Sequence, residues 1–179
     1  MKTIAKFILH TLLGWEIIGN FPKDLKKYVI IAAPHTHWLD FPLGICIKYA
    51  TGTPINYIGK ASLFKPPFGF LFRWLGGSPV DRSKSNDRVK AIIDLFDSHE
   101  QYVLGMSPEG TRKKVEKWKT GFYYIAKGAK VPIAMATLDF KRKEIKISEP
   151  FYPTDDMEAD FKYFHQYFDG VEGKKPNLV

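Results

Sequence analysis

The sequence predicts an α/β fold in which a mixed, largely parallel sheet is flanked by helices. Short apolar runs rich in valine and isoleucine alternate along the chain with segments of helical periodicity, a pattern typical of parallel strands joined by helical crossovers. The strongest strand signal is Tyr28–Ala33, which is apolar, β-branched and bounded by lysine and proline. The clearest helix signal covers residues 86–99, whose apolar side chains recur at three- and four-residue steps opposite three aspartates.

The same two patterns predict the remaining elements in order along the chain. We expect helices at 1–15, 41–50, 68–75, 120–129 and 157–168. We expect further strands at 15–19, 54–59, 77–81, 102–106, 131–138 and 144–147. A length of 179 residues fits a single domain, 1–179, with the motifs concentrated in a core at 28–140.

The N-terminal segment, 1–18, is expected to carry an amphipathic helix that faces a membrane. Its larger apolar residues recur at helical steps and therefore share one face. These residues are Ile4, Phe7, Ile8, Leu12 and Trp15. Such a face either packs on its own domain or lies in a membrane interface, where tryptophan and lysine are favoured. No uninterrupted run of about 18 apolar residues occurs, so no transmembrane helix is predicted.

The balance of charges indicates an anionic partner. Lysine and arginine number 27 against 19 aspartates and glutamates, which leaves a formal net charge of +8. Such a surface attracts anionic membranes, nucleic acid or phosphate-bearing small molecules, although a solvated basic face needs no partner. A single cysteine, Cys46, excludes an internal disulfide.

One short segment after the strongest strand has the spacing of a general base and its orienting carboxylate. It reads His35-Thr36-His37-Trp38-Leu39-Asp40. An aspartate that accepts one ring N–H of a histidine holds the imidazole in a single tautomer, and the other ring nitrogen can then take a proton from a hydroxyl. His35 is therefore the candidate base, and Asp40 is the candidate orienting group.

A second segment after an apolar run, Ser107-Pro108-Glu109-Gly110-Thr111-Arg112, strengthens the first. Together with Gly76–Arg82 and Val131–Ile133, the two segments have the order and rough spacing of four sequence blocks. In these blocks the chain resembles the glycerolipid acyltransferases, the family of lysophosphatidic-acid (1-acylglycerol-3-phosphate) O-acyltransferases. The resemblance favours a catalytic His35 over a histidine in a surface turn.

The resemblance implies an O-acyltransferase of phospholipid biosynthesis. Its donor would be an acyl thioester on coenzyme A or acyl carrier protein, and its acceptor a lysophospholipid, by default 1-acylglycerol-3-phosphate. Because the acceptor hydroxyl is itself the nucleophile, the enzyme would need His35 to take a proton and Asp40 to hold the imidazole. The resemblance implies no metal and no redox cofactor.

A phosphate on the acceptor calls for fixed cations, and the resemblance places the second and third blocks around it. Arg112 and Lys60 are the first candidates, since the guanidinium matches a phosphate with forked donors. Arg82 is a further candidate, although the aspartate before it also suits a local ion pair.

Three neighbours of Arg112 complete the predicted acceptor site. Glu109 would orient Arg112 or the acceptor glycerol, and Gly110 would let the backbone turn sharply or approach the ligand. Thr111 would hydrogen-bond the phosphate or cap the next segment.

The chain departs from the family pattern at several positions. Pro34 replaces the usual asparagine before the histidine, and His37 stands where serine is common. The segment that follows Lys60 has Ser62 in place of a glutamate, and Ser107 replaces a phenylalanine. These changes leave the His35–Asp40 spacing intact and leave the identity of the acceptor open.

The charge and the N-terminal helix indicate a peripheral protein on the cytoplasmic face of the cell membrane. Its partners would be the thioester donor, the lysophospholipid and an anionic membrane surface, with acyl carrier protein as one form of the donor and without nucleic acid. The aromatic stretch 64–74 would face the bilayer or pack in the core.

Two alternatives remain open. The residue types at His35, His37 and Asp40 bind zinc in metal-dependent hydrolases, although further ligands are hard to find in the sequence. A non-enzymatic, basic lipid-binding module fits the charge and the N-terminal helix, but it leaves the histidine–aspartate and Glu-Gly-Thr-Arg segments unexplained.

Overall fold

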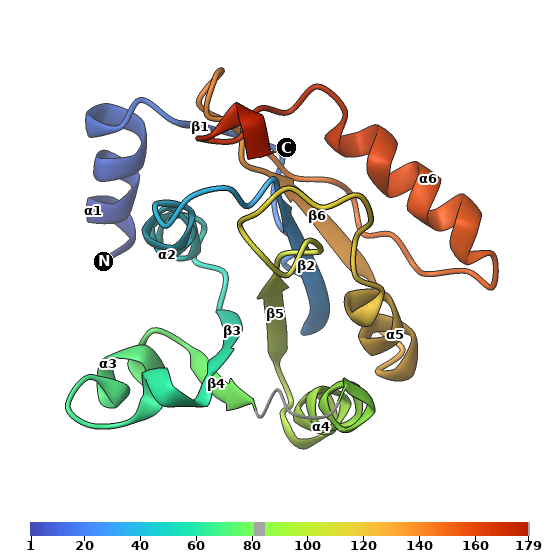
Figure 1. Cartoon of the computed structure of the whole chain (residues 1–179). Coiled ribbons are helices and arrows are strands. Elements are labelled where there is room, and N and C mark those ends of the chain that lie inside the picture. The colour runs from blue at the N-terminus through green and yellow to red at the C-terminus, as the bar shows by residue number, and fades with distance from the viewer. Residues whose placement is uncertain (81–84, 179) are drawn as a thin grey trace.

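The computed structural model describes residues 1–80 and 85–178 and confirms the predicted α/β class (Figure 1). Within this part of the chain, five strands form a sheet in the order β4-β3-β5-β2-β6, and every neighbouring pair is parallel. The strands are β2 Lys27–Ala33, β3 Ile55–Lys60, β4 Gly77–Val80, β5 Tyr102–Met106 and β6 Ile133–Thr137.

A smaller ladder extends the structure beyond β6. It pairs β1 Glu16–Ile18 with β7 Glu144–Lys146 in parallel. Isolated antiparallel bridges connect β6 to Ile147 and Phe151, just after β7. The prediction of a mixed sheet that is largely parallel is therefore confirmed.

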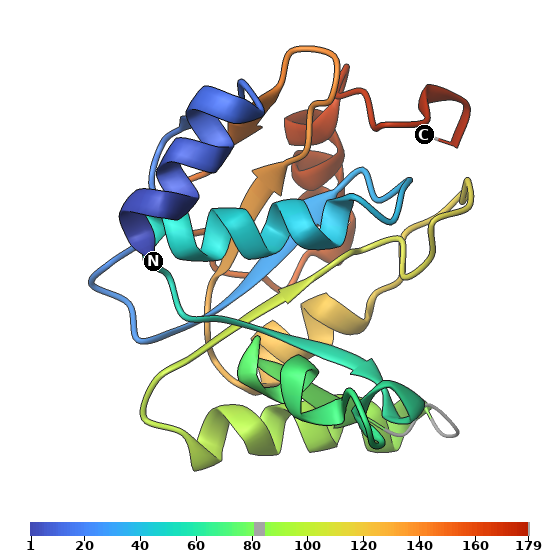
Figure 2. The ribbon, with the colours of Figure 1, turned by 90° about the vertical axis from the view of Figure 1, so that its left-hand side faces the viewer.

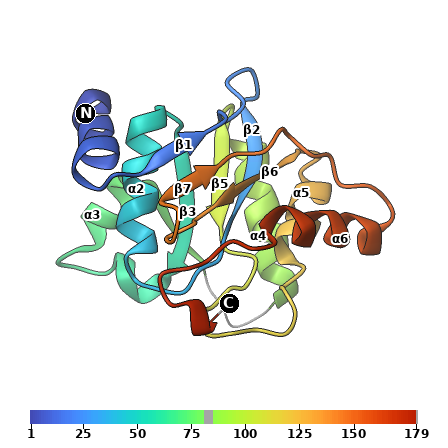
Figure 3. The ribbon, with the colours of Figure 1, turned by 90° about the horizontal axis from the view of Figure 1, so that it is seen from above.

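Helices cover both faces of the sheet (Figures 1 and 3). On one side lie α1 Lys2–Lys6, its π-helical continuation η1 Phe7–Leu12, α2 Asp40–Thr51 and α3 Gly69–Trp74. On the other side lie α4 Ser85–Ser98, α5 Gly121–Gly128 and α6 Met157–Phe168. Two short 3-10 turns, η2 Ala61–Phe64 and η3 Pro176–Leu178, complete the elements of the described residues.

The position of strand β2 in the sheet explains why its sequence is apolar throughout and does not alternate with polar residues. Tyr28 and Ile30 pack in the core beneath α1 and α2, whereas Val29 and Ile31 pack in the core beneath α4, α5 and α6. Successive side chains of a strand point to opposite faces, so a strand with helices on both sides is buried on both. β2 is therefore a central strand, and the segment that follows it starts from a rigid position.

The N-terminal helix is shorter than the sequence predicts. α1 continues into η1, which ends at Leu12, and Glu16–Ile18 then form β1. The helix expected over 1–15, within the segment 1–18, therefore ends at Leu12 instead, whereas the strand expected over 15–19 is present as β1 and pairs with β7. None of the described helices is long and apolar enough to cross a membrane.

This helix also packs on a face that the periodicity did not identify. Ala5 and Leu9 are buried in the core that α2 shares, whereas Ile4, Phe7 and Leu12 are exposed. Helical periodicity reports which residues lie on the same side, but it does not report which side the domain covers. The small side chain of Ala5 suits a close helix–helix approach, whereas Ile4, Phe7 and Leu12 remain on the exposed side of the helix.

The carboxyl ends of the parallel strands meet at one edge of the sheet. Figure 2 shows the loop after β2, the long loop after β5 and the C-terminal segment converging there. In open sheets of parallel strands, ligands bind in the crevice outside the carboxyl ends. The two sequence segments of greatest interest, 35–40 and 107–112, both lie in these loops.

The loop that contains residues 107–112 begins at the end of β5, a strand buried in the core. A substitution within β5 tests this central position. Leu104 is 0% exposed in the core beneath α4 and α5. We expect Leu104→Ala to lower the free energy of unfolding by roughly 2–5 kcal/mol, because it removes apolar contacts and leaves a cavity. The same change at Leu12, which is 65% exposed, should alter it by about 0.5 kcal/mol or less. Urea denaturation of both variants measures the difference, and equal effects would contradict the central position of β5.

Candidate active site

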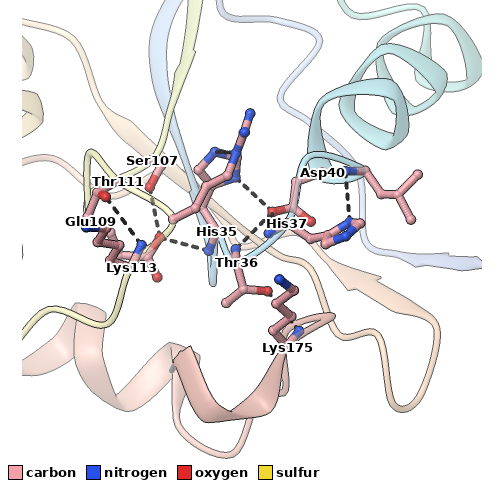
Figure 4. Close-up of polar contacts among 11 residues, drawn as sticks. His35, Thr36, His37, Asp40, Ser107, Glu109, Thr111, Lys113 and Lys175 are labelled. Atoms are coloured by element: carbon pink, nitrogen blue, oxygen red, sulfur yellow. Dashed lines mark hydrogen bonds and ion pairs between the residues drawn. The ribbon is translucent and has the colours of Figure 1, made fainter.

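The loop between β2 and α2 is closed by the carboxylate of Asp40, the first residue of α2. Its Oδ2 atom accepts the backbone N–H of Thr36 at 3.0 Å and that of His37 at 2.9 Å (Figure 4). A carboxylate in the first turn also suits the positive end of the helix dipole. Asp40 therefore shapes the loop that carries the candidate base.

The same oxygen atom also binds the imidazole. His35 Nδ1 lies 2.9 Å from Asp40 Oδ2. The aspartate side chain is 2% exposed and the histidine side chain is 25% exposed, so a buried carboxylate holds a ring whose other side is open. Asp40 Oδ1 is buried and has no hydrogen-bond partner among the described residues. The two residues thus have the geometry of a base and its orienting group.

A second buried carboxylate, Glu109, holds the backbone of the same loop. Its Oε2 atom accepts the backbone N–H of His35 at 2.8 Å and the hydroxyl of Ser107 at 2.9 Å (Figure 4). Burial raises the pKa of the Glu109 carboxyl, while the hydrogen bonds from Ser107 and from the His35 backbone act in the opposite direction. Glu109 therefore connects the two sequence segments, and its hydrogen bonds go to His35 and Ser107 instead of Arg112.

The turn after Glu109 requires the glycine that follows. Gly110 has a φ of +64°, and an added Cβ would lie 2.9 Å from the Lys119 side chain. Lys119 is itself held by its backbone N–H, which donates to Pro108 O at 2.8 Å. The Thr111 hydroxyl oxygen accepts the backbone N–H of Lys113 at 3.3 Å within the same loop.

The guanidinium of Arg112 lies beside the open side of the imidazole. Arg112 Nε donates to His35 Nε2 at 3.3 Å, across 77 residues of sequence. The arginine side chain is exposed, and it has no carboxylate partner among the described residues. A guanidinium on an exposed side chain therefore lies at the nitrogen that would act as the base.

Of the other predicted cations, only Lys60 lies within the described residues, and it is further along the sheet edge. Lys60 is exposed at the carboxyl end of β3. β5 separates β3 from β2, so the Lys60 backbone lies about 10 Å sideways from β2, within reach of a long side chain. Arg82, also predicted to contact the acceptor, lies outside the described residues.

The comparison with known protein families fits this arrangement. The family model described as acyltransferase matches residues 15–138, which is more than half of the chain. The chain belongs to the acyltransferase family. The resemblance predicted from the four sequence segments is confirmed at this level.

The solved structures add a similar fold to the family assignment. The acyltransferase is similar to PlsC from Thermotoga maritima, a 1-acyl-sn-glycerophosphate (LPA) acyltransferase, with a TM-score of 0.65 and 22% sequence identity. The match covers 95% of this chain and 76% of that chain. At this identity the likeness shows a common fold. No curated protein matches the sequence.

Two parts of the acyltransferase site were not found from the sequence. Ser107 stood out as a departure from the family pattern, but its bond to Glu109 gave no sequence signal. Thr36 is buried, and its hydroxyl oxygen accepts the backbone N–H of Lys175 at 3.2 Å (Figure 4). An added Cβ at Gly173 would lie 2.6 Å from the same hydroxyl oxygen. The C-terminal segment therefore packs directly on the loop between β2 and α2.

A cavity of about 450 Å³ lies next to the site, on the side of α6. Pro34 and Glu109 form part of its wall, opposite Trp118, His165 and Phe168. The rings of Trp118 and His165 are 4.4 Å apart between centroids. Glu109 thus contacts both the cavity and the backbone of His35.

The second histidine of the loop does not join the first. His37 Nδ1 accepts the backbone N–H of Leu39 at 3.2 Å, which turns its ring toward the start of α2. Across residues 1–80 and 85–178, no group of three or more histidine, cysteine, aspartate or glutamate side chains is arranged to hold a metal ion. The metal-dependent hydrolase alternative therefore receives no support from this geometry.

The buried carboxyl of Glu109 predicts a pH-dependent stability. Its pKa in the folded enzyme lies above the ordinary value of 4.5, so the folded chain holds this proton more tightly than the unfolded chain. The stability that the proton contributes is present below pH 4.5 and is lost as the pH rises through the raised pKa. The glutamine of Glu109→Gln has no such proton to lose. As the pH rises from 4.5 through the raised pKa, urea denaturation should therefore show the free energy of unfolding of the wild type falling relative to that of the variant.

The matched control is Glu116→Gln in the same loop. Glu116 is exposed, and the change should leave the pH dependence of the free energy of unfolding as it is in the wild type. Similar pH slopes for Glu109→Gln and the wild type would contradict a raised pKa at Glu109.

Proposed function

We propose that this acyltransferase transfers a fatty acyl group from an acyl thioester to the hydroxyl of a phosphate-bearing lysophospholipid. The observation that carries the proposal is the His35–Asp40 pair, 2.9 Å apart, with the Arg112 guanidinium 3.3 Å from the other imidazole nitrogen. A general base that lies next to a phosphate-binding cation suits an acceptor that has both a hydroxyl and a phosphate. The similarity to the LPA acyltransferase of Thermotoga maritima supports 1-acylglycerol-3-phosphate as the default acceptor.

The proposed reaction proceeds by direct transfer. The acceptor hydroxyl oxygen attacks the thioester carbonyl carbon while His35 Nε2 takes the hydroxyl proton. Asp40 stabilises the imidazolium that forms and holds it in place. The carbon–sulfur bond then breaks, and His35 returns the proton to the departing thiolate, which leaves the ester and the free thiol of coenzyme A or acyl carrier protein. The thioester supplies the activation, so the proposed route uses no metal and no redox cofactor.

The remaining candidates divide between binding and positioning. Arg112 would bind the acceptor phosphate, with Lys60 approaching from β3 and Arg82 as a further predicted ligand. Gly110 and Thr111 would hold the turn that presents Arg112. Glu109 would act as a positioning residue, because its buried carboxylate accepts the backbone N–H of His35.

Product analysis tests the base. We expect His35→Ala to lower the rate of acyl transfer by a factor of roughly 100 to 10,000, since a positioned general base contributes that much. Mass spectrometry would follow the diacyl product formed from acyl-CoA, or from the acyl carrier protein thioester, with a panel of lysophospholipids. The control is His99→Ala, which removes an exposed imidazole at the end of α4.

The outcomes of that assay are distinct. Near-normal transfer by His35→Ala in a folded protein would remove the proposed mechanism. Ester or thioester cleavage that a chelator abolishes would favour the hydrolase alternative. A preference for lysophosphatidate over lysophospholipids with larger head groups would support the proposed acceptor.

We also propose that one side of the enzyme rests on an anionic membrane, where both acceptor and product reside. Exposed apolar residues gather on α1, η1 and the segment around α3, on the same side of the molecule (Figures 2 and 3). They include Ile4, Phe7 and Leu12 from the N-terminal helix and Phe68, Phe70 and Trp74 from the second segment. Exposed aromatic and aliphatic side chains beside lysines are typical of interfacial binding, and the net charge of +8 favours anionic lipid.

Vesicle binding tests this surface. We expect Phe68→Ser with Phe70→Ser to weaken binding to vesicles of mixed phosphatidylcholine and phosphatidylglycerol by roughly tenfold or more, because two apolar anchors are lost. Phe70 is 72% exposed, so the fold should persist. The control is Tyr152→Ser, an exposed aromatic outside both segments. Equal binding by all three proteins in vesicle sedimentation would contradict a membrane role for this face.

A further inference from the structure

The hydrogen bond between Arg112 and His35 has a consequence for the base. A guanidinium has only donors and stays protonated at any ordinary pH. Arg112 Nε can therefore donate to His35 Nε2 only if that nitrogen carries its lone pair. The ring proton must then lie on Nδ1, where it is donated to Asp40 Oδ2. The imidazole is in the tautomer that a general base requires, but the lone pair that would accept the substrate proton is already occupied.

The guanidinium is held weakly in this position. Its contact with Nε2 is a single hydrogen bond of 3.3 Å to a neutral ring. Its side chain is exposed, and the described residues offer it no carboxylate. A phosphate would offer forked, charge-assisted hydrogen bonds in place of one bond to a neutral acceptor. The Arg112 guanidinium is therefore expected to leave the imidazole nitrogen and bind a phosphate when one is present.

We propose that Arg112 is a lock on the base that the phosphate monoester of the acceptor releases. This inference rests on the proposed function and extends it from binding to control. When the phosphate takes the guanidinium, Nε2 becomes free at the moment when the acceptor hydroxyl arrives. Arg112 thereby makes the phosphate a condition for catalysis and not only a source of affinity.

The lock would protect the donor from water. With a free Nε2, a water molecule could attack the thioester carbonyl, give its proton to His35, and release a fatty acid and a thiol as the carbon–sulfur bond breaks. With Nε2 occupied by Arg112, water meets no base. A molecule without a phosphate, water included, would therefore find the enzyme inactive.

Thioester hydrolysis without acceptor tests the lock. Purified enzyme would be given palmitoyl-CoA, or the same acyl group on acyl carrier protein, with and without inorganic phosphate. In the wild type we expect hydrolysis to rise about tenfold with phosphate, because the hydrogen bond to Nε2 is broken by the anion. Arg112→Met should hydrolyse at the raised rate whether or not phosphate is present.

Two controls define the route. Lys114→Met removes the same charge from an exposed position in the same loop and should behave as the wild type. Adding His35→Gln to Arg112→Met should abolish the extra hydrolysis, because water would then have no base. Hydrolysis by Arg112→Met no faster than that of the wild type, or phosphate stimulation that persists in this variant, would overturn the lock.

A measurement on the imidazole separates this inference from the proposed function. Nitrogen-15 NMR of labelled histidine, with His35 assigned by its substitution, reports the hydrogen bond at Nε2 without any turnover. Phosphate should shift the Nε2 resonance of the wild type and leave that of Arg112→Met unchanged. Shifts of this kind without acyl transfer would retain the lock and reject the proposed acyltransfer, whereas transfer without such shifts would reject the lock alone.

Discussion

The candidate site depends on one oxygen atom, Asp40 Oδ2. It binds the backbone N–H groups of Thr36 and His37 as well as the imidazole of His35. The first two bonds give the loop its shape, and the third sets the ring within that shape. Since α2 begins at Asp40 and is buried against the sheet, the oxygen is fixed to the rigid part of the domain. Loss of this carboxylate would therefore disturb the position of the base as well as its chemistry.

Glu109 performs a different task with the same chemical group. Its carboxylate accepts the backbone N–H of His35 and also the hydroxyl of Ser107. The two carboxylates are close enough that the charge of Asp40 also raises the pKa of Glu109, although burial has the larger effect. The hydrogen bonds of Glu109 offset part of the unfavourable burial of its carboxylate, and they join the loop after β5 to the loop after β2. The position of Arg112 relative to His35 depends on that connection.

Much of the fold was predictable, because parallel strands buried on both faces are apolar runs, and β5 was located at the residues that form it. The His35–Asp40 pair was predictable because it lies within one loop, where spacing limits distance. Tertiary contacts were not predictable in this way. Nothing in the sequence near Thr36 indicates that Lys175 binds it, and nothing near Glu109 indicates that its partner is the backbone of His35. The neighbours that cover Ala5 and Leu9 were not predictable for the same reason, since periodicity does not reveal which side of a helix the domain covers.

The strand order has a consequence for how the enzyme acquires its activity. β2 lies between β5 and β6, so the loop that carries His35 is completed by residues that follow it by 74 and 77 positions, Glu109 and Arg112. Closing such long loops costs conformational entropy that only the finished sheet repays, and folds dominated by distant pairings form slowly. The helices can form from local sequence, whereas His35, Glu109 and Arg112 meet only when the central strands have paired. The candidate site is therefore assembled late in folding, together with the centre of the sheet.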